Sequence, residues 1–228
     1  MTQNAAPVPS TSVDDIPKLV ADLRHVYDQR RTHALEWRLE QLRGIERFLV
    51  ERESEIHAAL RADLGKPLQE AFVAELGFTA NEARLMRKKL PSWIKPDKVG
   101  TPLPMMPASA HVHHDPLGLV LVIGPWNYPV LLLISPLIGA VAGGNCTILK
   151  PSEVAANTSA MIAELLPKYV DPECVKVVQG GVPETTALLE QRFDHILYTG
   201  NAAVGRIVMT AAAKHLTPVT LELGGKSP

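Results

Sequence analysis

The run from residue 116 to residue 149 contains no charged side chain, and it constrains the fold of this 228-residue chain more than any other feature. A helix of this length and polarity could cross a membrane. Glycine and proline interrupt the run, however, and in lipid they would leave backbone groups without hydrogen-bond partners. The interrupting residues include Gly118, Gly124, Pro125, Pro129, Pro136 and Gly139. We therefore interpret the run as a buried part of a globular protein.

Strands of a parallel sheet that are covered on both faces have continuous apolar sequences. Residues 118–123 fit such a strand, residues 131–141 a short buried helix and residues 146–149 a second strand. The alternation continues, with strands predicted at 175–178, 195–199 and 219–223 and helices at 158–166, 184–191 and 204–214. Five strands that alternate with helices predict an α/β fold with a Rossmann-like, doubly wound parallel sheet.

The first 100 residues have a different character. They carry 16 Lys and Arg and 15 Asp and Glu, against 7 and 9 in the rest of the chain. Apolar residues recur there at helical spacing, namely Leu35, Leu39, Leu42, Leu49, Ile56, Leu60, Phe72, Leu76, Thr79, Ala83, Met86 and Leu90. Gly65 followed by Pro67 predicts the end of one helix, and Pro91 predicts the end of the next. We predict a helical arm over 16–95 with its charged faces in solvent.

The segments on either side of this arm have no helical pattern. Residues 1–15 are polar, with no basic start and no apolar core, which indicates a flexible tail rather than a signal peptide. Residues 96–116 are rich in proline, which argues against helix and favours a connecting hairpin. His111 and His113 alternate there as metal ligands on one strand face could. Because no cysteine or second histidine cluster accompanies them, we expect no metal.

The composition excludes several classes of function. With 46% hydrophobic and 21% charged residues the chain is typical of soluble globular proteins. A net charge of −1 gives no electrostatic case for nucleic acid or an acidic membrane as a partner. The two cysteines, Cys146 and Cys174, cannot build a disulfide framework, so we expect a reducing, cytoplasmic location.

Ligands of doubly wound sheets bind at the carboxyl ends of the strands, which selects four segments. The first, Gly-Pro-Trp-Asn-Tyr-Pro at 124–129, holds the amide of Asn127 between two prolines. Such an amide offers two donors to an oxyanion, or it is the capping residue of a rigid turn. In the second, Lys150 and Glu153 follow a strand, where they could hold ribose hydroxyls or phosphate. They could instead form a salt bridge beside a helix start capped by Ser152.

The third segment, Gly-Asn-Ala-Ala-Val-Gly at 200–205, opens a helix whose exposed amides suit a pyrophosphate, although a lone glycine-rich turn is common. The fourth is Leu-Glu-Leu-Gly-Gly at 221–225. Alternation places Glu222 near a strand end among apolar neighbours, where desolvation would raise the pKa of its carboxyl and suit it to act as a general base. A purely structural carboxylate is the alternative.

Together the four segments resemble one family, the aldehyde dehydrogenases, and within it the class 3-type branch. The resemblance spans the chain from about residue 18 and is sharpest at 124–129, 149–153, 198–200 and 214–228. It implies the oxidation of an aldehyde to a carboxylic acid through a thiohemiacetal and a thioester, with NAD, or alternatively NADP, as cofactor. It also implies a small-molecule aldehyde as the partner and a homo-oligomer when the protein is complete.

The resemblance assigns roles to individual residues. Asn127 is similar to the family's oxyanion-stabilising amide and Glu222 to its general base. The residues similar to cofactor contacts are Pro125, Trp126, Lys150, Glu153, Gly200, Gly205, Leu223 and Gly224. One local departure is that Asn201 and Ala202 stand where the family commonly has Ser and Thr.

The family's catalytic cysteine lies some tens of residues beyond the Glu-Leu-Gly-Gly motif, whereas this chain ends at Pro228. Cys146 falls in a strand that the family uses for packing, and Cys174 follows a turn. We therefore expect a cofactor-binding domain over 16–220, with only the start of a catalytic domain at 221–228, and no activity from the chain alone. The alternative is a non-catalytic fragment that binds dinucleotide or another protein.

Overall fold

The computed structural model describes residues 10–226 and has a five-stranded parallel sheet at its centre. The strands are β3 (Leu119–Ile123), β4 (Cys146–Lys150), β5 (Val175–Val177), β6 (His195–Gly200) and β7 (Val219–Leu223). Their spatial order is β5-β4-β3-β6-β7, so the chain starts in the middle, adds strands on one side and then returns to the other. The predicted doubly wound sheet is confirmed.

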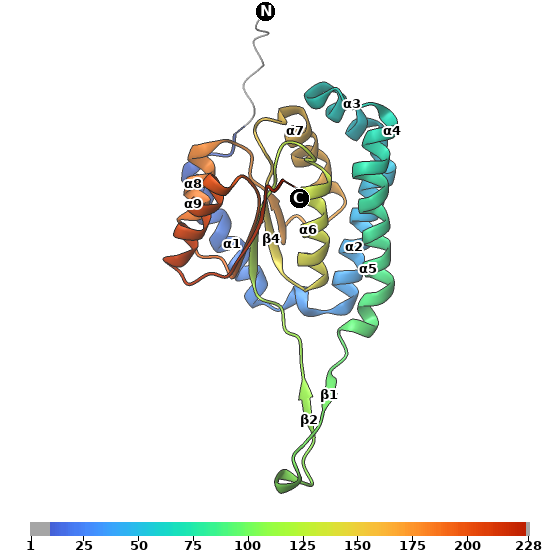
Figure 1. The fold of residues 1–228 in the computed structure, drawn as a ribbon, viewed down its shortest axis with the longest axis vertical. Coiled ribbons are helices and arrows are strands. Elements are labelled where there is room, and N and C mark those ends of the chain that lie inside the picture. Colours follow the sequence, from blue (N-terminus) through green and yellow to red (C-terminus); the bar gives the residue numbers. More distant parts are fainter. Residues whose placement is uncertain (1–9, 227–228) are drawn as a thin grey trace, which may run out of the picture.

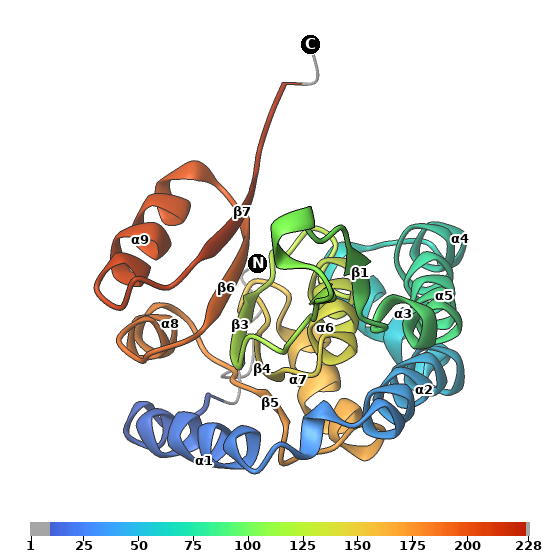
Figure 2. The ribbon, with the colours of Figure 1, turned by 90° about the horizontal axis from the view of Figure 1, so that it is seen from below.

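Helices cover both faces of this sheet (Figure 1, Figure 2). One face carries α1 (Ile16–Asp28), α8 (Val182–Leu189) and α9 (Ala202–Ala213). The other carries α6 (Leu131–Ala142) and α7 (Ala156–Leu165), with α2 (Leu35–Glu51), α3 (Glu53–Leu64) and α5 (Phe78–Trp93) outside them. Successive side chains of β3 enter opposite cores, with Val120 in one and Leu121 in the other. This arrangement explains why residues 116–149 are uncharged. β3 and β4 are covered by helices on both faces, and α6 lies between the sheet and the outer helices.

The predicted N-terminal arm does not form one layer. Its first helix, α1, packs through Ile16, Val20 and Leu23 on the face opposite to α2, α3 and α5. The preceding residues are also tied down: Thr11 donates its N–H to the carbonyl of Gln179 at 3.0 Å, and Val13–Asp15 forms a 3-10 helix. Residues 11–15 therefore lie against the body of the protein, and the rest of the predicted tail, 1–9, lies outside the described residues.

The helical periodicity of the arm is largely confirmed, with two corrections. Phe72 is 47% exposed, because it begins a π-helical segment, Phe72–Gly77, between α4 (Leu68–Ala71) and α5. The wider π turn shifts side chains off the regular helical stripe. Pro91 does not end its helix, which continues to Trp93. Only Ser92 and Trp93 follow this proline in the helix, so few backbone hydrogen bonds are disturbed.

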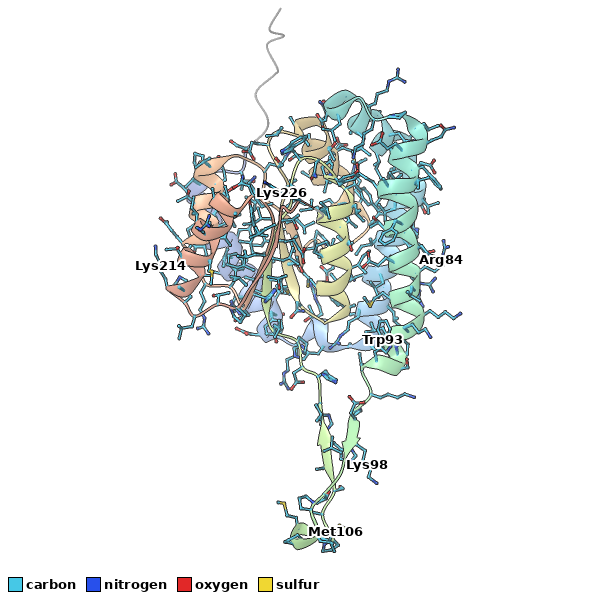
Figure 3. All side chains as sticks on the ribbon, in the orientation of Figure 1. Arg84, Trp93, Lys98, Met106, Lys214 and Lys226 are labelled. Carbon is cyan, nitrogen blue, oxygen red and sulfur yellow. The ribbon has the colours of Figure 1, made fainter. Side chains whose placement is uncertain are left out.

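A two-stranded antiparallel hairpin, β1 (Asp97–Val99) and β2 (Ala110–Val112), projects from the body as the proline-rich segment predicted. Its tip is apolar and exposed, with Leu103 87% and Met106 61% exposed (Figure 3). His111 lies exposed on β2. Within residues 10–226, no three His, Cys, Asp or Glu side chains are grouped as a metal site would need. Over the same residues, no helix combines the length and apolar character of a membrane span.

The domain boundary predicted at residue 220 falls inside β7. The whole strand pairs with β6, up to the pair Gly200 and Leu223, so residues 221–223 belong to the same sheet. The last residues of the Gly-Gly-Lys-Ser-Pro motif, 227 and 228, lie outside the described residues.

Candidate cofactor and oxyanion site

A cavity of about 380 Å³ opens at the carboxyl ends of β3, β4 and β6. The order of strands reverses between β3 and β6, which is where doubly wound sheets bind their ligands. Its lining includes five of the predicted cofactor contacts, Pro125, Trp126, Lys150, Glu153 and Gly200. Three of the four predicted segments therefore meet in one space.

Asn127 lies in the exposed loop after β3, beside the residues that line the cavity. Its side-chain oxygen accepts the N–H of Tyr128 at 3.0 Å, and its backbone carbonyl accepts a hydrogen bond from Lys66 Nζ at 2.8 Å. The first bond orients the side-chain amide and the second holds the backbone, and neither N–H donor of Nδ2 has a partner among residues 10–226. The loop thus presents a fixed donor, as an oxyanion site requires.

Lys150 ends β4 and is only 2% exposed. Its Nζ donates to the carbonyl of Pro151 at 2.8 Å and to Glu153 at 3.4 Å. Burial lowers the pKa of Lys150 from its usual value, and the carboxylates of Glu153 and Glu184 partly oppose this effect. The third N–H of the ammonium remains available at the wall of the cavity.

The predicted salt bridge of Lys150 with Glu153 is present, whereas the predicted cap by Ser152 is wrong. α7 begins at Ala156 without a cap from Ser152, whose Oγ accepts the N–H of Val154 at 3.3 Å within the preceding loop. The contact of Lys150 and Glu153 with ribose or phosphate stays a prediction.

The turn after β6 opens α9, as predicted. Asn201 is the N-cap residue, and its side chain accepts the N–H of Val204 at 3.0 Å. Asn201 therefore caps α9 as a serine could, which occupies one of the exposed amides and leaves those of Ala202 and Ala203 free for an anion. Gly205 does not line the cavity. A Cβ at Gly205 would lie 3.0 Å from Leu223, so this glycine permits α9 to pack on β7.

The fourth segment differs from its prediction. Glu222 and Leu223 are exposed, and neither they nor Gly224 line the cavity. β7 is the edge strand and has one neighbouring strand. Apolar residues therefore do not surround the Glu222 carboxylate in this chain. The prediction that this carboxylate is desolvated is wrong for the chain. Register places Glu222 beside Thr199, which does line the cavity.

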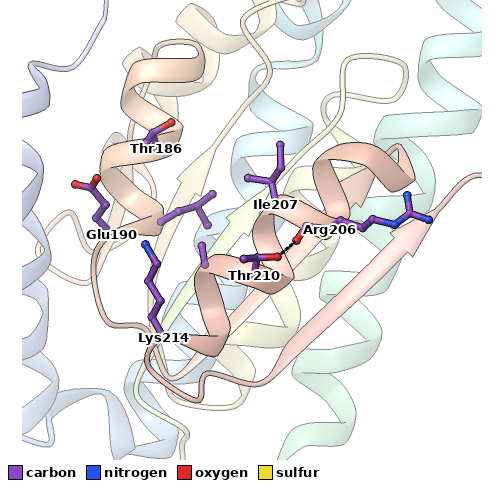
Figure 4. A pocket seen from close by; sticks show the side chains of 8 residues that line it. Thr186, Glu190, Arg206, Ile207, Thr210 and Lys214 are labelled. Carbon is purple, nitrogen blue, oxygen red and sulfur yellow. Dashed lines mark hydrogen bonds between the residues drawn. The ribbon is translucent and has the colours of Figure 1, made fainter.

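Part of the cavity wall was missed in the sequence. Gly181 and Val182 at the start of α8 and Ile207 of α9 line it, together with Val204 of the predicted segment 200–205. The Gly180-Gly181 turn after β5 was the available signal, since it also follows a parallel strand. A second hollow of about 360 Å³ continues between α8 and α9 and shares Thr186, Leu189 and Ile207 with the first. Figure 4 shows Glu190 at the end of α8 and Lys214 at the end of α9 among the side chains that line it.

Both cysteines lie far from this cavity along the strands. Cys146 begins β4 and Cys174 precedes β5, at the amino ends, and both thiols are fully buried. Contact with Cys174 and burial raise the pKa of the Cys146 thiol. Such a thiol is a poor nucleophile. Cys146 therefore packs as a small buried apolar group.

Comparisons with known proteins agree on one family. A family model described as "Aldehyde dehydrogenase family" matches residues 2–228. "Aldehyde dehydrogenase family 3 member H1" of Arabidopsis thaliana is 52% identical over 210 residues, which cover 92% of this chain and 43% of the relative. "Aldehyde dehydrogenase" of Craterostigma plantagineum is 50% identical over 94% of this chain and 45% of its own length. The chain thus spans about half the length of the curated relatives it matches.

Solved structures agree with the fold. "Substrate bound state of Staphylococcus Aureus AldH" superposes with a TM-score of 0.91 at 40% identity, over 93% of this chain and 46% of that one. "NAD+ complex structure of aldehyde dehydrogenase from bacillus cereus" has a TM-score of 0.86 at 25% identity, over 96% and 45% of the two chains.

Proposed function

We propose, since this chain belongs to the aldehyde dehydrogenase family, that it forms the dinucleotide-binding part of an enzyme that oxidises an aldehyde to a carboxylic acid. The observation that carries the proposal is the single cavity formed by the loops after β3, β4 and β6. It contains a buried lysine, a helix N-terminus and, beside it, a fixed amide donor.

The residues of the cavity fit a dinucleotide in three ways. The free amides at the start of α9 can bind a pyrophosphate. The remaining N–H of Lys150 and the carboxylate of Glu153 can hold ribose hydroxyls. The apolar side chains of Val182, Leu189 and Ile207 offer a slot for a flat base between α8 and α9. When bound, NAD or NADP would supply the hydride acceptor.

Two residues of this chain would take part in the chemistry. Asn127 would donate from Nδ2 to the oxygen that becomes negative when a nucleophile adds to the aldehyde carbonyl. Glu222 would take a proton from the water that hydrolyses the thioester left after the thiohemiacetal has been oxidised by loss of a hydride. Its exposure here means that this role requires additional protein surface over β7. The buried thiols at the amino ends of β4 and β5 are not placed to supply the nucleophile.

NAD is the cofactor that the site favours. The Glu153 side chain is 46% exposed at the rim of the cavity, where its negative charge would repel a ribose 2′-phosphate. NADP remains possible, because an exposed carboxylate can turn away. We also propose a cytoplasmic location, which the two free thiols support, and a homo-oligomer for the complete protein, which the exposed apolar hairpin tip supports.

The test is a titration of NAD into the 228-residue chain by isothermal calorimetry. Replacing Lys150 with Gln removes a charge-assisted bond to the ribose, worth about 1.5–3 kcal/mol, and should weaken binding roughly tenfold or more. Lys168→Gln is the matched control, because Lys168 forms an exposed ion pair with Glu164 on the surface. The Lys168→Gln chain should bind NAD with the same affinity as the unmodified chain.

Equal affinities for Lys150→Gln and Lys168→Gln would overturn the assignment of the cavity. A chain that binds no NAD at millimolar concentration, although circular dichroism shows it folded, would reject the proposed dinucleotide site altogether.

A further inference from the structure

We propose that residues 63–66, the end of α3 and the turn that follows it, position both loops of the candidate site, with Lys66 acting on the Asn127 loop and Asp63 acting on the Glu153 loop. The proposal concerns the geometry of the loops, and its catalytic meaning rests on the proposed function. The turn itself contributes no side chain to the lining of the cavity.

Lys66 is buried beneath the loop that carries Asn127. Its side chain is 9% exposed and donates to Glu75 at 2.5 Å and to the backbone carbonyl of Asn127 at 2.8 Å. The ammonium also lies 4.0 Å from the centre of the Tyr128 ring, a cation–π contact. A single cation therefore holds two consecutive residues of the loop, one of which provides the proposed oxyanion donor.

Glu75, the partner of Lys66, fixes the other end of the same loop. It is fully buried in the π-helical segment, and its second oxygen accepts the N–H groups of Val130 at 2.8 Å and Leu131 at 3.3 Å. These are amides at the start of α6, which otherwise would have no partner. The ion pair of Lys66 and Glu75 thus spans the loop from Asn127 to the first turn of α6.

Asp63 acts in the same way on the next loop. Its two carboxylate oxygens accept four hydrogen bonds, from the backbone N–H and side chain of Asn157 and from the backbone N–H and hydroxyl of Thr158, at 2.7–3.0 Å. The backbone donors belong to the first turn of α7, so a residue of α3 caps a helix more than ninety residues away in sequence. The loop between β4 and α7 contains Glu153.

Gly65 allows the side chains of Asp63 and Lys66 to face different loops. It has a left-handed backbone with φ +66° at the end of α3, which a side chain would disfavour. The chain turns there, so Asp63 remains on α3 and faces α7, whereas Lys66 faces the Asn127 loop. Two opposite charges three residues apart thereby hold the loops after two neighbouring strands in one relative position.

The test is hydrogen exchange of the folded chain, read by mass spectrometry over peptides 124–132 and 151–159. Lys66→Met should speed exchange about tenfold or more in the first peptide and leave the second unchanged. Asp63→Ala should do the reverse. Lys18→Met and Asp22→Ala are matched controls, because these residues form an exposed ion pair on α1 and should change neither peptide.

Conservative variants separate positioning from general packing. Lys66→Arg keeps a charged donor and Asp63→Asn keeps an acceptor oxygen, so each should restore most of the lost protection. Should Lys66→Met fail to fold, Lys66→Gln, which retains a donor, carries the same comparison. The proposal is wrong if both peptides and the strands speed up together, or if neither loop responds.

A binding measurement distinguishes this proposal from the proposed function. If the chain binds NAD, Asp63→Ala should weaken binding several-fold while Asp22→Ala does not, and equal affinities would refute the action of Asp63 on the cofactor loop. If the unmodified chain binds no NAD, the dinucleotide site fails, but loop-specific exchange would still establish the positioning turn.

Discussion

The ends of the inner strands and the end of the edge strand carry comparable motifs in very different surroundings. Lys150, at the end of β4, is buried, bonded and part of a cavity wall, whereas Glu222, near the end of β7, is exposed. β4 has strands on both sides and helices on both faces. β7 has one neighbouring strand and presents its other edge outward. A position near a strand end therefore defines a site only where neighbouring elements enclose it.

The same contrast applies to the anchoring of the loops. Side chains from the helical arm hold the loops after β3 and β4, through Lys66 and Asp63. The residues after β7 have no comparable anchor within the described part of the chain. The three following predictions test whether the inner strands and β7 also differ in how much their residues contribute to stability.

The largest expected difference is in the unfolding free energy that is lost when a leucine of β3 or of β7 is replaced. Leu121, fully buried in β3, should lose about 3 kcal/mol of unfolding free energy when replaced by Ala, because a cavity remains between two packed layers. Leu223, 44% exposed on β7, should lose less than about 1 kcal/mol. Urea unfolding followed by circular dichroism measures both. Similar losses at the two sites would show that β7 is as well packed as β3.

A smaller difference in stability is expected between the alanine variants of two glycines. A Cβ at Gly200, the last residue of β6, would lie 2.2 Å from the hydroxyl of Tyr198, so Gly200→Ala must displace a buried ring and should cost about 1–3 kcal/mol. At Gly224 nothing lies within 4 Å, and Gly224→Ala should change stability by less than about 0.5 kcal/mol. Thermal unfolding of both variants makes the comparison. A neutral Gly200→Ala would mean that the ring moves freely.

The smallest effect concerns pH. Burial lowers the pKa of His195, which begins β6 and lies 3.1 Å from Thr220 of β7. As the pH falls through about 6.5, the unfolded chain binds a proton that the folded chain does not yet bind, so stability should decrease. His195→Gln should reduce this slope by less than one proton. If stability falls with pH at the same slope in the unmodified chain and in His195→Gln, His195 is not a source of the acid instability.

Much of the architecture could be predicted from local patterns. The uncharged run indicated strands buried on both faces, since only such strands lack a polar side, and the alternation of strands and helices indicated parallel order. The cavity followed from the same rule, because strand ends of this fold converge. Val182 and Ile207 were missed, since ordinary apolar residues at helix starts carry no signal of what they face.

Long-range contacts could not be predicted. The segment with Asp63 and Lys66 indicated a helix end and nothing more, because no local pattern shows that a carboxylate will cap a helix ninety residues away. The exposure of Glu222 was missed for a related reason. Alternation along a strand shows which side chains share a face, but not whether another element covers that face.

The sequence by itself determined the elements, their order and the strand ends at which polar side chains gather. These properties depend on neighbours within a few residues, where periodicity and turn chemistry act. Only the tertiary structure decided that α1 and α2 cover opposite faces, that β7 is the edge strand and that Lys66 and Asp63 hold the loops of the site. Burial and charge pairing depend on which distant segments meet, and many sequences with the same local pattern would bring different segments together.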